Sequence, residues 1–474
     1  MRSRWLAPSL QGLVVAFHAS VATFVVPLKA DDVFWHLRAG ELMLETGAIP
    51  RTNVFSFTAP QTPWVAHEWL SELLFAWVFR QGPALLSLLA LGLHVAALGL
   101  VAVLARGAGK TPVASTVLTL FAGFFLLANW SIRPYLLGNV LMLVLLWLVD
   151  RPPRPARSIA LFALFVVWAN AHGSWLIGLG LLGVWTLAGT LRREDRVGLR
   201  WRELLLALGA CLLTPHHVRG LVFPLQYLAT PLWAEPGFLE EILEWQRVPL
   251  ASPLGELLLA AVGLSLLVVI ASKTRPTSER AVVFLLFSLA AFSAVRNVPL
   301  MGIALAVALP PHLAAVAGRL QGNLFGALER AGEVDRRASS VLPIGAWALA
   351  AVLEFRAPPA RTPDFFPVEL VSSLSSRPRP ARLFHPFNWG GALLFSGQPV
   401  FIDQRNDCYP TEVWRDYLTV HHLRPGWEAV LDRWHIDAVA WSREGALAES
   451  LRQHPGWRLE HEDQDAVLFS RRPR

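Results

Sequence analysis

Two adjacent aspartates, Asp31 and Asp32, directly follow the first long apolar stretch of the chain. A carboxylate is costly to keep ionised beside hydrocarbon, so this position is unusual. An aspartate here can act as a general base that takes a proton from an attacking hydroxyl or amine. Alternatively, the pair can serve as a helix N-cap and first-turn acid that the helix dipole stabilises. On a helix the two side chains point about 100° apart, so we expect only one to face a site.

Two arginines stand in short breaks between apolar runs, each beside asparagine and proline. Arg133 lies in NWSIRPY and Arg296 lies in VRNVP. An arginine at the centre of a bilayer costs roughly 2.5–3.5 kcal/mol on the insertion scale, and one at the end of a span costs less because it can reach the headgroups. A guanidinium fork is also well suited to bind phosphate. Both arginines are therefore candidate phosphate ligands.

Histidines and a glutamate occupy other polar breaks, and we expect them to contribute to substrate binding. The candidates are His36, His67, Glu68, His172 and His216. They could hydrogen-bond phosphate or another polar group, or simply belong to turns. Their spacing is not typical of a metal site, so we predict no metal cofactor; a divalent ion held by Glu68 and the histidines is the alternative. Residues 214–254 could form a lid, in which Glu240, Glu241 and Glu244 would be the solvated face.

The elements that must position these residues are predominantly membrane spans. Of 474 residues, 54% are hydrophobic and only 16% are charged, which is typical of a polytopic membrane protein. We expect an α-helical chain with apolar spans near residues 8–28, 84–105, 112–128, 135–149, 158–169, 175–190, 203–214, 255–271, 281–295, 299–318 and 341–354. We expect the first span to be retained, although it could instead be a signal peptide.

Basic loops indicate how the chain is oriented in the membrane. Arginine-rich stretches such as DRPPRPARS and LRREDRVGLRWRE should be cytoplasmic by the positive-inside rule. This predicts about eleven spans with the N-terminus inside and the C-terminus outside. The net charge of +7 lies largely in such loops, so we expect no nucleic-acid partner. Every unusual polar motif then falls on the outer face of the membrane.

The first outer loop, residues 31–80, should contain two helices that lie on the membrane surface. DDVFWHLRAGELMLETG has amphipathic spacing and ends in Gly47, and HEWLSELLFAWVFRQG leads into the next span. A turn-rich segment with Pro50, Pro60 and Pro63 joins them. This loop would therefore hold the aspartate pair at the outer surface.

A span that ends in an acidic residue and is followed by two surface helices resembles the GT-C superfamily of membrane glycosyltransferases. The stretch DDVFWHLRAGELMLETGAIPRTNVFSFT…PWVAHEWLSE carries the resemblance, which in topology covers residues 1–355. It implies transfer of a sugar from a polyprenyl-phosphate carrier. The acidic residue of the family's first outer loop, which lies at the active site, matches Asp31 or Asp32. The acidic pair that oligosaccharyl transferases use for metal in their second outer loop is not matched.

Residues 362–474 differ in character from the preceding chain, with shorter apolar runs and mixed charges. Residues 381–385, 399–403, 437–442, 457–462 and 466–471 are predicted strands, and 411–422, 426–435 and 445–454 are predicted helices. This indicates a small extracytoplasmic α/β domain. Asp403, Arg405, Asn406 and Asp407 follow a predicted strand, where such domains often bind ligands. The domain could bind the acceptor or cover the membrane site.

The resemblance implies an enzyme of the bacterial inner membrane that uses a polyprenyl-phosphate sugar as donor. The acceptor would be an envelope glycan, lipid or protein. A transporter or flippase of lipid-linked sugars is an alternative, but it should show two similar halves and charges deep within spans. A non-catalytic envelope scaffold is a second alternative.

Overall fold

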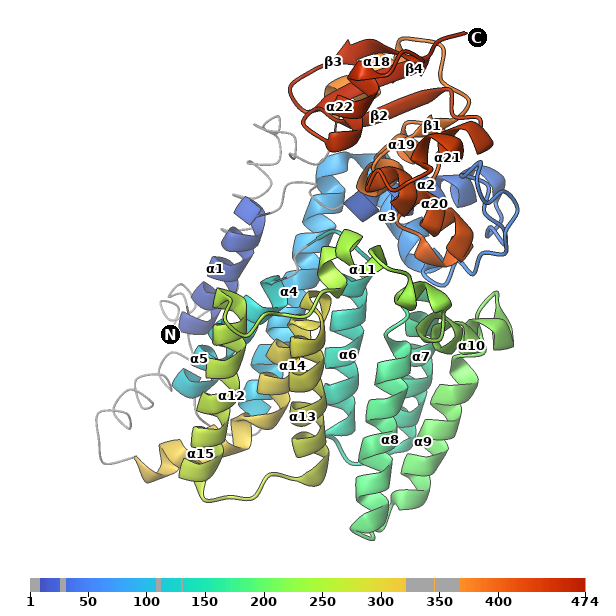
Figure 1. Ribbon diagram of the computed structural model, residues 1–474. Coiled ribbons are helices and arrows are strands. Elements are labelled where there is room, and N and C mark those ends of the chain that lie inside the picture. Colours follow the sequence, from blue (N-terminus) through green and yellow to red (C-terminus); the bar gives the residue numbers. More distant parts are fainter. Residues whose placement is uncertain are drawn as a thin grey trace.

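The structure, a computed structural model, describes residues 9–25, 31–107, 112–128, 131–320, 345 and 367–473. Figure 1 shows a bundle of long helices with a smaller α/β part at one end. The bundle contains α1 (Leu10–Val25), α4 (Pro83–Gly107), α5 (Pro112–Leu127), α6 (Tyr135–Val149), α7 (Pro155–Ala171), α8 (Trp175–Leu191), α9 (Val197–Ala210), α12 (Pro253–Ser272), α13 (Ser278–Ser293), α14 (Pro299–Ala308) and α15 (Pro310–Arg319).

These helices coincide with ten of the predicted apolar segments, and the eleventh, 341–354, lies outside the described residues apart from Gly345. Two described helices, Pro83–Arg106 and Pro253–Ser272, are long and apolar enough to cross a membrane unaided. The pair 295–308 and Pro310–Arg319 would form a third span bent by 49°. Five more helices are apolar but shorter, so the number of spans stays a prediction.

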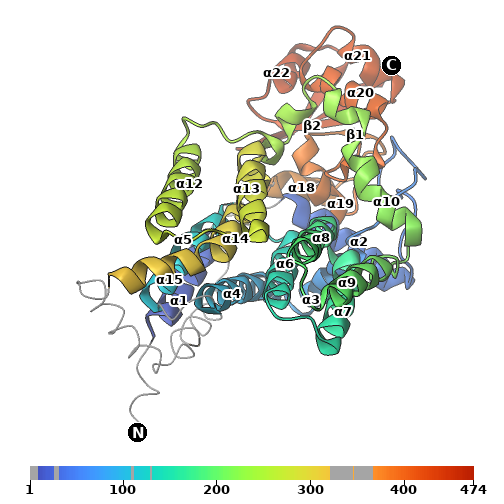
Figure 2. The same ribbon diagram turned by 90° about the horizontal axis from the view of Figure 1, so that it is seen from below.

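The outer surface of the bundle is strongly apolar. Ile159 is 71% exposed, Leu205 64% and Ile270 71%, and many other leucines and valines are similarly uncovered. Contiguous apolar surface on this scale is unfavourable in water and is typical of a face that contacts lipid. Figure 2, which views the bundle almost end-on, shows α12 and α15 on one side and the α7–α9 group on the other.

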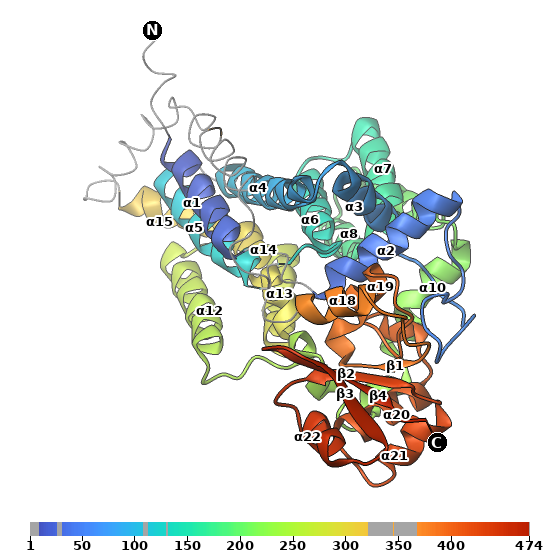
Figure 3. The ribbon, with the colours of Figure 1, turned by 90° about the horizontal axis from the view of Figure 1, so that it is seen from above.

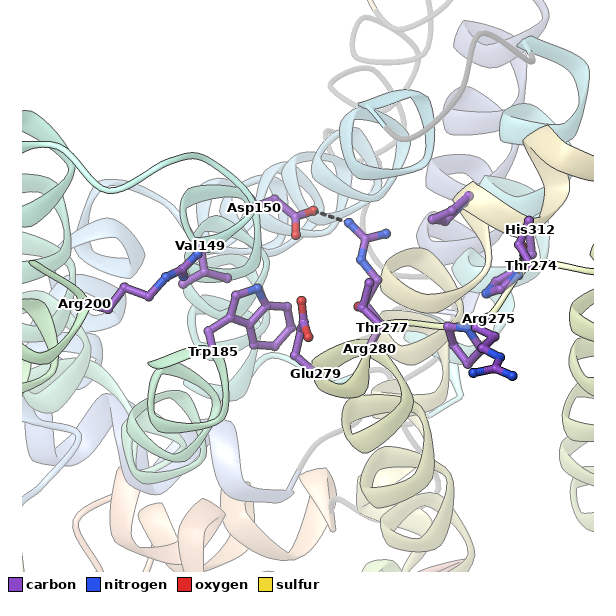
Figure 4. A pocket seen from close by; sticks show the side chains of 12 residues that line it. Val149, Asp150, Trp185, Arg200, Thr274, Arg275, Thr277, Glu279, Arg280 and His312 are labelled. Atoms are coloured by element: carbon purple, nitrogen blue, oxygen red, sulfur yellow. Dashed lines mark hydrogen bonds and ion pairs between the residues drawn. The ribbon is translucent and has the colours of Figure 1, made fainter. Parts of the chain in front are cut away.

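A cavity of about 490 Å³ opens at the end of the bundle away from the α/β part. Asp150 and Arg280 form an ion pair of 3.0 Å across it, as Figure 4 shows. Arg200, Glu279 and His312 are among the other lining residues. None of the residues predicted to form the functional site lines this cavity.

Two helices of the first outer loop, α2 (Asp31–Thr46) and α3 (Trp69–Gln81), cross with their backbones nearly in contact. A Cβ atom built on Gly40 would lie 2.1 Å from the carbonyl oxygen of Glu72 and 2.6 Å from the Cβ of Ala76. Only glycine allows this approach without displacing one helix. The crossing fixes where α2 carries Asp32 and where α3 carries its acids.

Gly40→Ala is expected to destabilise the protein by about 1–3 kcal/mol, because the added methyl group must push α2 and α3 apart. Thermal unfolding in detergent, followed by tryptophan fluorescence, measures the effect. Gly92→Ala in α4 is the matched control, since a Cβ there meets nothing within 4 Å. Equal stability of the two variants would contradict the close crossing.

The C-terminal part has a four-stranded sheet in the order β1-β2-β4-β3. Its first pair is parallel and the other two pairs are antiparallel. The strands are β1 (Leu383–Phe384), β2 (Ala438–Ser442), β3 (Trp457–Glu462) and β4 (Ala466–Arg471), and the helices are α18 (Val368–Ser375), α19 (Gly390–Phe395), α20 (Thr411–His421), α21 (Trp427–Arg433) and α22 (Ala446–Gln453). The small α/β domain predicted from the sequence is therefore present within the described residues.

The prediction that residues 399–403 form a strand is wrong. Val400 forms only isolated bridges, to Leu383 and to Ser56 of the first outer loop. Pro399 has no N–H to donate, and the segment bends away from the sheet toward that loop. It therefore links the sheet to the first outer loop instead of extending the sheet.

The α/β domain and the first outer loop share one hydrophobic core. Trp35 and Trp64 of the loop belong to the same buried cluster as Phe401 and Trp414. The Thr62 hydroxyl donates a 2.9 Å hydrogen bond to the carbonyl of Cys408. Figure 3 shows α19 alongside α2. The two regions, predicted as separate modules, thus form one unit that holds α2 on the bundle. We call it the outer unit, after the orientation predicted from the sequence.

Candidate functional site

A network of opposite charges lies where the bundle meets the outer unit. Nη2 of Arg133 is 2.7 Å from Oδ2 of Asp32. Nη1 of Arg133 contacts Glu244, and the other oxygen of Glu244 is 3.4 Å from Nη1 of Arg296. Three residues predicted to be functional from separate loops, Asp32, Arg133 and Arg296, therefore converge around a fourth, Glu244. The side chain of Asp31 lies outside the described part of the chain.

Local backbone features position the two arginines. Arg133 directly precedes Pro134, the N-cap residue of α6, which disfavours helix in the chain before it. Arg296 lies in a short 3-10 turn, Val295–Asn297, between α13 and α14. Its guanidinium carbon lies 4.2 Å from the ring centroid of Trp245, in a cation–π contact. Both arginines therefore project from rigid corners of the bundle.

Glu244 belongs to the segment 229–252, named the lid segment below, which joins α10 (His217–Leu228) to α12. It lies in a 3-10 turn, Leu243–Trp245, anchored where Val295 donates a 3.1 Å backbone hydrogen bond to Gln246. Upstream, Phe238 is fully buried against Trp414 of the outer unit. This segment thus runs from the outer unit across to the arginines. The expectation that Glu244 belongs to a solvated face is wrong, because both of its oxygens contact arginine.

Burial dominates the electrostatics of Asp32. Removal from water raises the pKa of Asp32 to about 6, although Arg133 and Arg296 act in the opposite direction. Burial lowers the pKa of Arg133, but Asp32 and Glu244 outweigh it and raise that pKa overall. Arg133 is therefore a permanent cation, and Asp32 changes charge close to neutral pH. A carboxylate with a pKa near the working pH is suited to proton transfer.

A second cluster surrounds Glu68 at the start of α3. Oε1 of Glu68 is 3.5 Å from Nε2 of His172 and 3.8 Å from Nε2 of His67, and Oε2 is 4.0 Å from Nε2 of His36. The other ring nitrogen of His36 is 3.4 Å from the fully buried Glu72. Four of the five predicted histidine and glutamate candidates are therefore brought together by α2, α3 and the α7–α8 turn.

The turn between α7 and α8 docks His172 on this cluster. Nδ1 of His172 is 2.7 Å from the hydroxyl of Ser174, and a Cβ on Gly138 of α6 would lie 2.7 Å from the same nitrogen. The indole N–H of Trp69 donates a 2.7 Å hydrogen bond to Asn170, which ties the turn to α3. The motif NAHGS therefore has a mixed role, in which Asn170 holds the turn and His172 faces Glu68.

Burial disfavours the charged forms of Glu68, His36 and His172. It raises the pKa of Glu68, and it lowers the pKa of His172 to about 3. Burial and the charge of Arg133 hold the pKa of His36 well below its usual range. Neutral imidazoles both donate and accept hydrogen bonds. The cluster is thus suited to binding hydroxyl groups.

His216 lies apart from the ion pairs, at the N-terminal end of α10. Burial lowers its pKa, against a backbone hydrogen bond to Ala66. The ring centroids of His67 and Phe223 are 4.8 Å apart, and Phe223 belongs to the same helix as His216. His216 therefore lies beside the Glu68 cluster but has no ion pair with it among those found in the described residues.

The charged motif after residue 402 is structural in this fold. Asp403 and Arg405 form a 2.6 Å ion pair, and both side chains have zero exposure. The guanidinium of Arg405 lies between the rings of Phe55 and Trp64, 4.8 Å and 4.7 Å from their centroids. A ligand cannot reach this pair, so the sequence-based hypothesis that these two residues bind one is wrong. The pair instead holds the first outer loop on the α/β domain.

One group of described residues could hold a metal ion. Ligand atoms of Glu241, His421 and His422 all lie within 4.8 Å of one another. Glu241 comes from the lid segment and the histidines from the end of α20. Nothing in the sequence marks these histidines as functional, and Glu241 is expected there on a solvated face.

No family model matches the chain, and no curated protein matches it in sequence. Solved structures do match. An oligosaccharyltransferase, AglB from Archaeoglobus fulgidus in complex with an inhibitory peptide and a dolichol-phosphate, superposes with a TM-score of 0.57 and 10% identity over 97% of this chain and 74% of that one. The Archaeoglobus fulgidus oligosaccharyltransferase in complex with Zn and sulfate superposes with a TM-score of 0.53 and 10% identity, over 97% of this chain and 73% of that one.

ArnT from Cupriavidus metallidurans bound to undecaprenyl phosphate gives a TM-score of 0.47 and 15% identity, over 97% of both chains. At such identities the likeness concerns the fold. The solved neighbours are GT-C membrane glycosyltransferases, and the chain has the fold of the archaeal enzyme. The resemblance noted in the first outer loop is thereby confirmed at the level of fold.

Proposed function

We propose that this protein is a membrane glycosyltransferase that moves a sugar from a polyprenyl-phosphate carrier to an acceptor in the bacterial envelope. The observation that carries the proposal is the Asp32–Arg133 pair beside Arg296, where the bundle meets the outer unit. One site holds a titratable carboxylate and two guanidiniums, which are the groups needed for proton removal and phosphate binding. The dolichol-phosphate bound by the archaeal neighbour supports the kind of donor.

In the proposed reaction an acceptor hydroxyl or amine attacks the anomeric carbon of the sugar. The new bond to that carbon forms as its bond to the carrier phosphate oxygen breaks, and the electron pair leaves with the phosphate. Asp32 takes the acceptor proton. Arg133 and Arg296 stabilise the negative charge on the departing phosphate. The neutral His172, with Glu68, orients sugar hydroxyls. We propose that no cofactor is needed for this step, because a phosphate is already a good leaving group.

Glu244 stands where the phosphate would bind. It is the one carboxylate among the described residues that contacts both Arg133 and Arg296. A bidentate anion between two guanidiniums is the arrangement a phosphate would adopt. Donor binding would therefore displace Glu244 and move the lid segment. The free protein holds its own anion in the donor site.

Glu244→Gln is expected to tighten binding of polyprenyl phosphate by about tenfold, since removing a competing charged hydrogen bond is worth roughly 1.5 kcal/mol. Titration of the purified protein with the carrier lipid, followed through tryptophan fluorescence, measures the change. Glu462→Gln is the matched control, because Glu462 pairs with Arg443 and Arg452 and lies outside this segment. Unchanged or weaker binding in Glu244→Gln would show that Glu244 does not occupy the phosphate position.

The rate of transfer should rise with pH through a midpoint near 6. The pKa of Asp32 is raised to about 6, so below that pH Asp32 is protonated and cannot accept a proton. We expect kcat/KM, which reports the free enzyme, to fall about tenfold for each pH unit below the midpoint. A rate independent of pH between 5 and 7 would exclude Asp32 as the base.

We place the site on the outer face of the inner membrane, with the α/β domain in the periplasm. The carrier would enter laterally from the bilayer, and an envelope glycan, lipid or protein would approach from the periplasm. A flippase would share the lipid site, and a scaffold would instead bind an envelope partner through its α/β domain, but neither would need Asp32. If substitution of Asp32 abolishes sugar transfer but leaves carrier binding intact, the protein is an enzyme and not a flippase or a scaffold.

A further inference from the structure

A group of potential metal ligands joins the lid segment to the outer unit. Oε1 of Glu241 is 3.3 Å from Nε2 of His421 and 3.7 Å from Nε2 of His422. One carboxylate oxygen therefore faces two imidazole nitrogens. Both distances exceed the 2.7–2.9 Å or so of a charge-assisted hydrogen bond. All three ligand atoms lie within 4.8 Å of one another.

This spacing fits a tetrahedral ion. Zn²⁺ bonds to imidazole nitrogen and carboxylate oxygen at about 2.0–2.2 Å, so its ligand atoms lie about 3.3–3.5 Å apart. The separations of Oε1 of Glu241 from the two imidazole nitrogens, 3.3 Å and 3.7 Å, approach these values. The side chain of His422 is 33% exposed, which leaves an open side for a water molecule as fourth ligand. Two histidines and a glutamate are a donor set that Zn²⁺ prefers.

The surroundings hold the ligands in place. The hydroxyl of Tyr417 lies 3.1 Å from Nδ1 of His421, as a partner that orients the ring of a ligand histidine. Arg415 pairs with Glu235 at 2.9 Å, and Arg424 donates to the carbonyl of Pro236 at 3.3 Å. The lid segment is therefore already docked on α20 just before Glu241. Contacts of both the lid segment and α20 therefore hold the three candidate ligands in place.

We propose that Glu241, His421 and His422 bind a divalent cation of the Zn²⁺ class, which clips the lid segment to α20. Glu244 and Trp245 follow Glu241 by three and four residues and contact Arg133 and Arg296. The clip therefore sets how firmly the lid covers the two arginines. This metal site lies outside the ion-pair network around Asp32, and its existence does not rest on the proposed transfer activity.

The test is zinc binding to the full-length protein in detergent, purified without a histidine tag. Zn²⁺ is titrated against a competing chelating dye, and Co²⁺ absorption reports tetrahedral coordination. We expect one Zn²⁺ per chain at this site, with affinity lowered at least about 100-fold in His421→Asn and in His422→Asn, and about tenfold in Tyr417→Phe. His454→Asn is the matched control, because His454 faces a single glutamate, Glu428, at 3.7 Å. Its zinc affinity should equal that of wild type.

Limited trypsin digestion tests the clip itself. Arg247 is exposed just beyond Glu244, and zinc should slow cleavage there in wild type but not in His421→Asn. Wild type that binds zinc no better than the two histidine variants would overturn the site. Zinc binding that leaves cleavage at Arg247 unchanged would overturn the clip. Neither readout depends on glycosyl transfer, so failure here is distinct from failure of the proposed function.

Discussion

Asp32→Asn is expected to lower kcat for glycosyl transfer by roughly 10²–10⁴-fold, the range that a positioned general base contributes. Asparagine keeps the size of the side chain and can still contact Arg133, but it cannot accept a proton. Binding of the carrier lipid should stay within a few-fold of wild type, because Arg133 and Arg296 remain. Single-turnover transfer from a labelled polyprenyl-phosphate sugar measures the loss.

Asp31→Asn is the comparator, since it removes the same charge one residue earlier in α2. A neighbouring residue on a helix points about 100° away, and Arg133 contacts Asp32. We therefore expect Asp31→Asn to retain far more activity than Asp32→Asn. The reverse ranking would assign the base to Asp31, and full activity in both variants would remove the aspartate pair from the mechanism.

Asp403→Ala is expected to destabilise the outer unit by about 3–5 kcal/mol, because it leaves the guanidinium of Arg405 buried without its partner. Asp403 also accepts a 2.6 Å hydrogen bond from Tyr409. The same guanidinium donates to Asn53 at 3.1 Å, so the first outer loop should loosen together with the domain. Urea unfolding followed by tryptophan fluorescence measures the loss of stability.

Glu462→Gln provides the contrast on the same domain. Its ion pair with Arg443 is 3.0 Å long, but the arginine side chain is 49% exposed and the glutamate 33%. Pairs screened by water contribute about 1 kcal/mol or less. A loss of similar size in Asp403→Ala and Glu462→Gln would mean that the buried pair does not hold the outer unit together.

Much of the fold can be predicted from the sequence, because long apolar runs and helix-stop residues act locally. The predicted span 135–149 coincides with α6, since Pro134 opens the helix and Asp150 follows its last apolar residue. The predicted surface helix at 31–47 is α2, which ends beside Gly47. Asp32, Arg133 and Arg296 are conspicuous in the sequence as charges next to apolar runs, and the structure brings them together around Glu244.

The remaining features depend on contacts between distant parts of the chain. Glu244 follows Glu240 and Glu241 in a polar stretch, so nothing local separates it from a solvated face, yet it meets Arg133, 111 residues earlier. The sequence suggests Arg405 as a ligand-binding residue. Its burial is invisible there, because it depends on Phe55 and Trp64 from the first outer loop. His421 and Glu241 become neighbours only when the lid segment docks on α20. No pattern of spacing or periodicity encodes such pairs.

Mass spectrometry of the lipids that co-purify with the protein tests the central claim most directly. Wild type, Asp32→Asn and Arg296→Ala are compared after identical extraction. A polyprenyl-phosphate sugar should accompany wild type, accumulate on Asp32→Asn, which binds the donor without consuming it, and be lost from Arg296→Ala. Bulk phospholipid alone in all three, at equal amounts, would contradict a site built around Arg133 and Arg296 for a lipid-linked sugar.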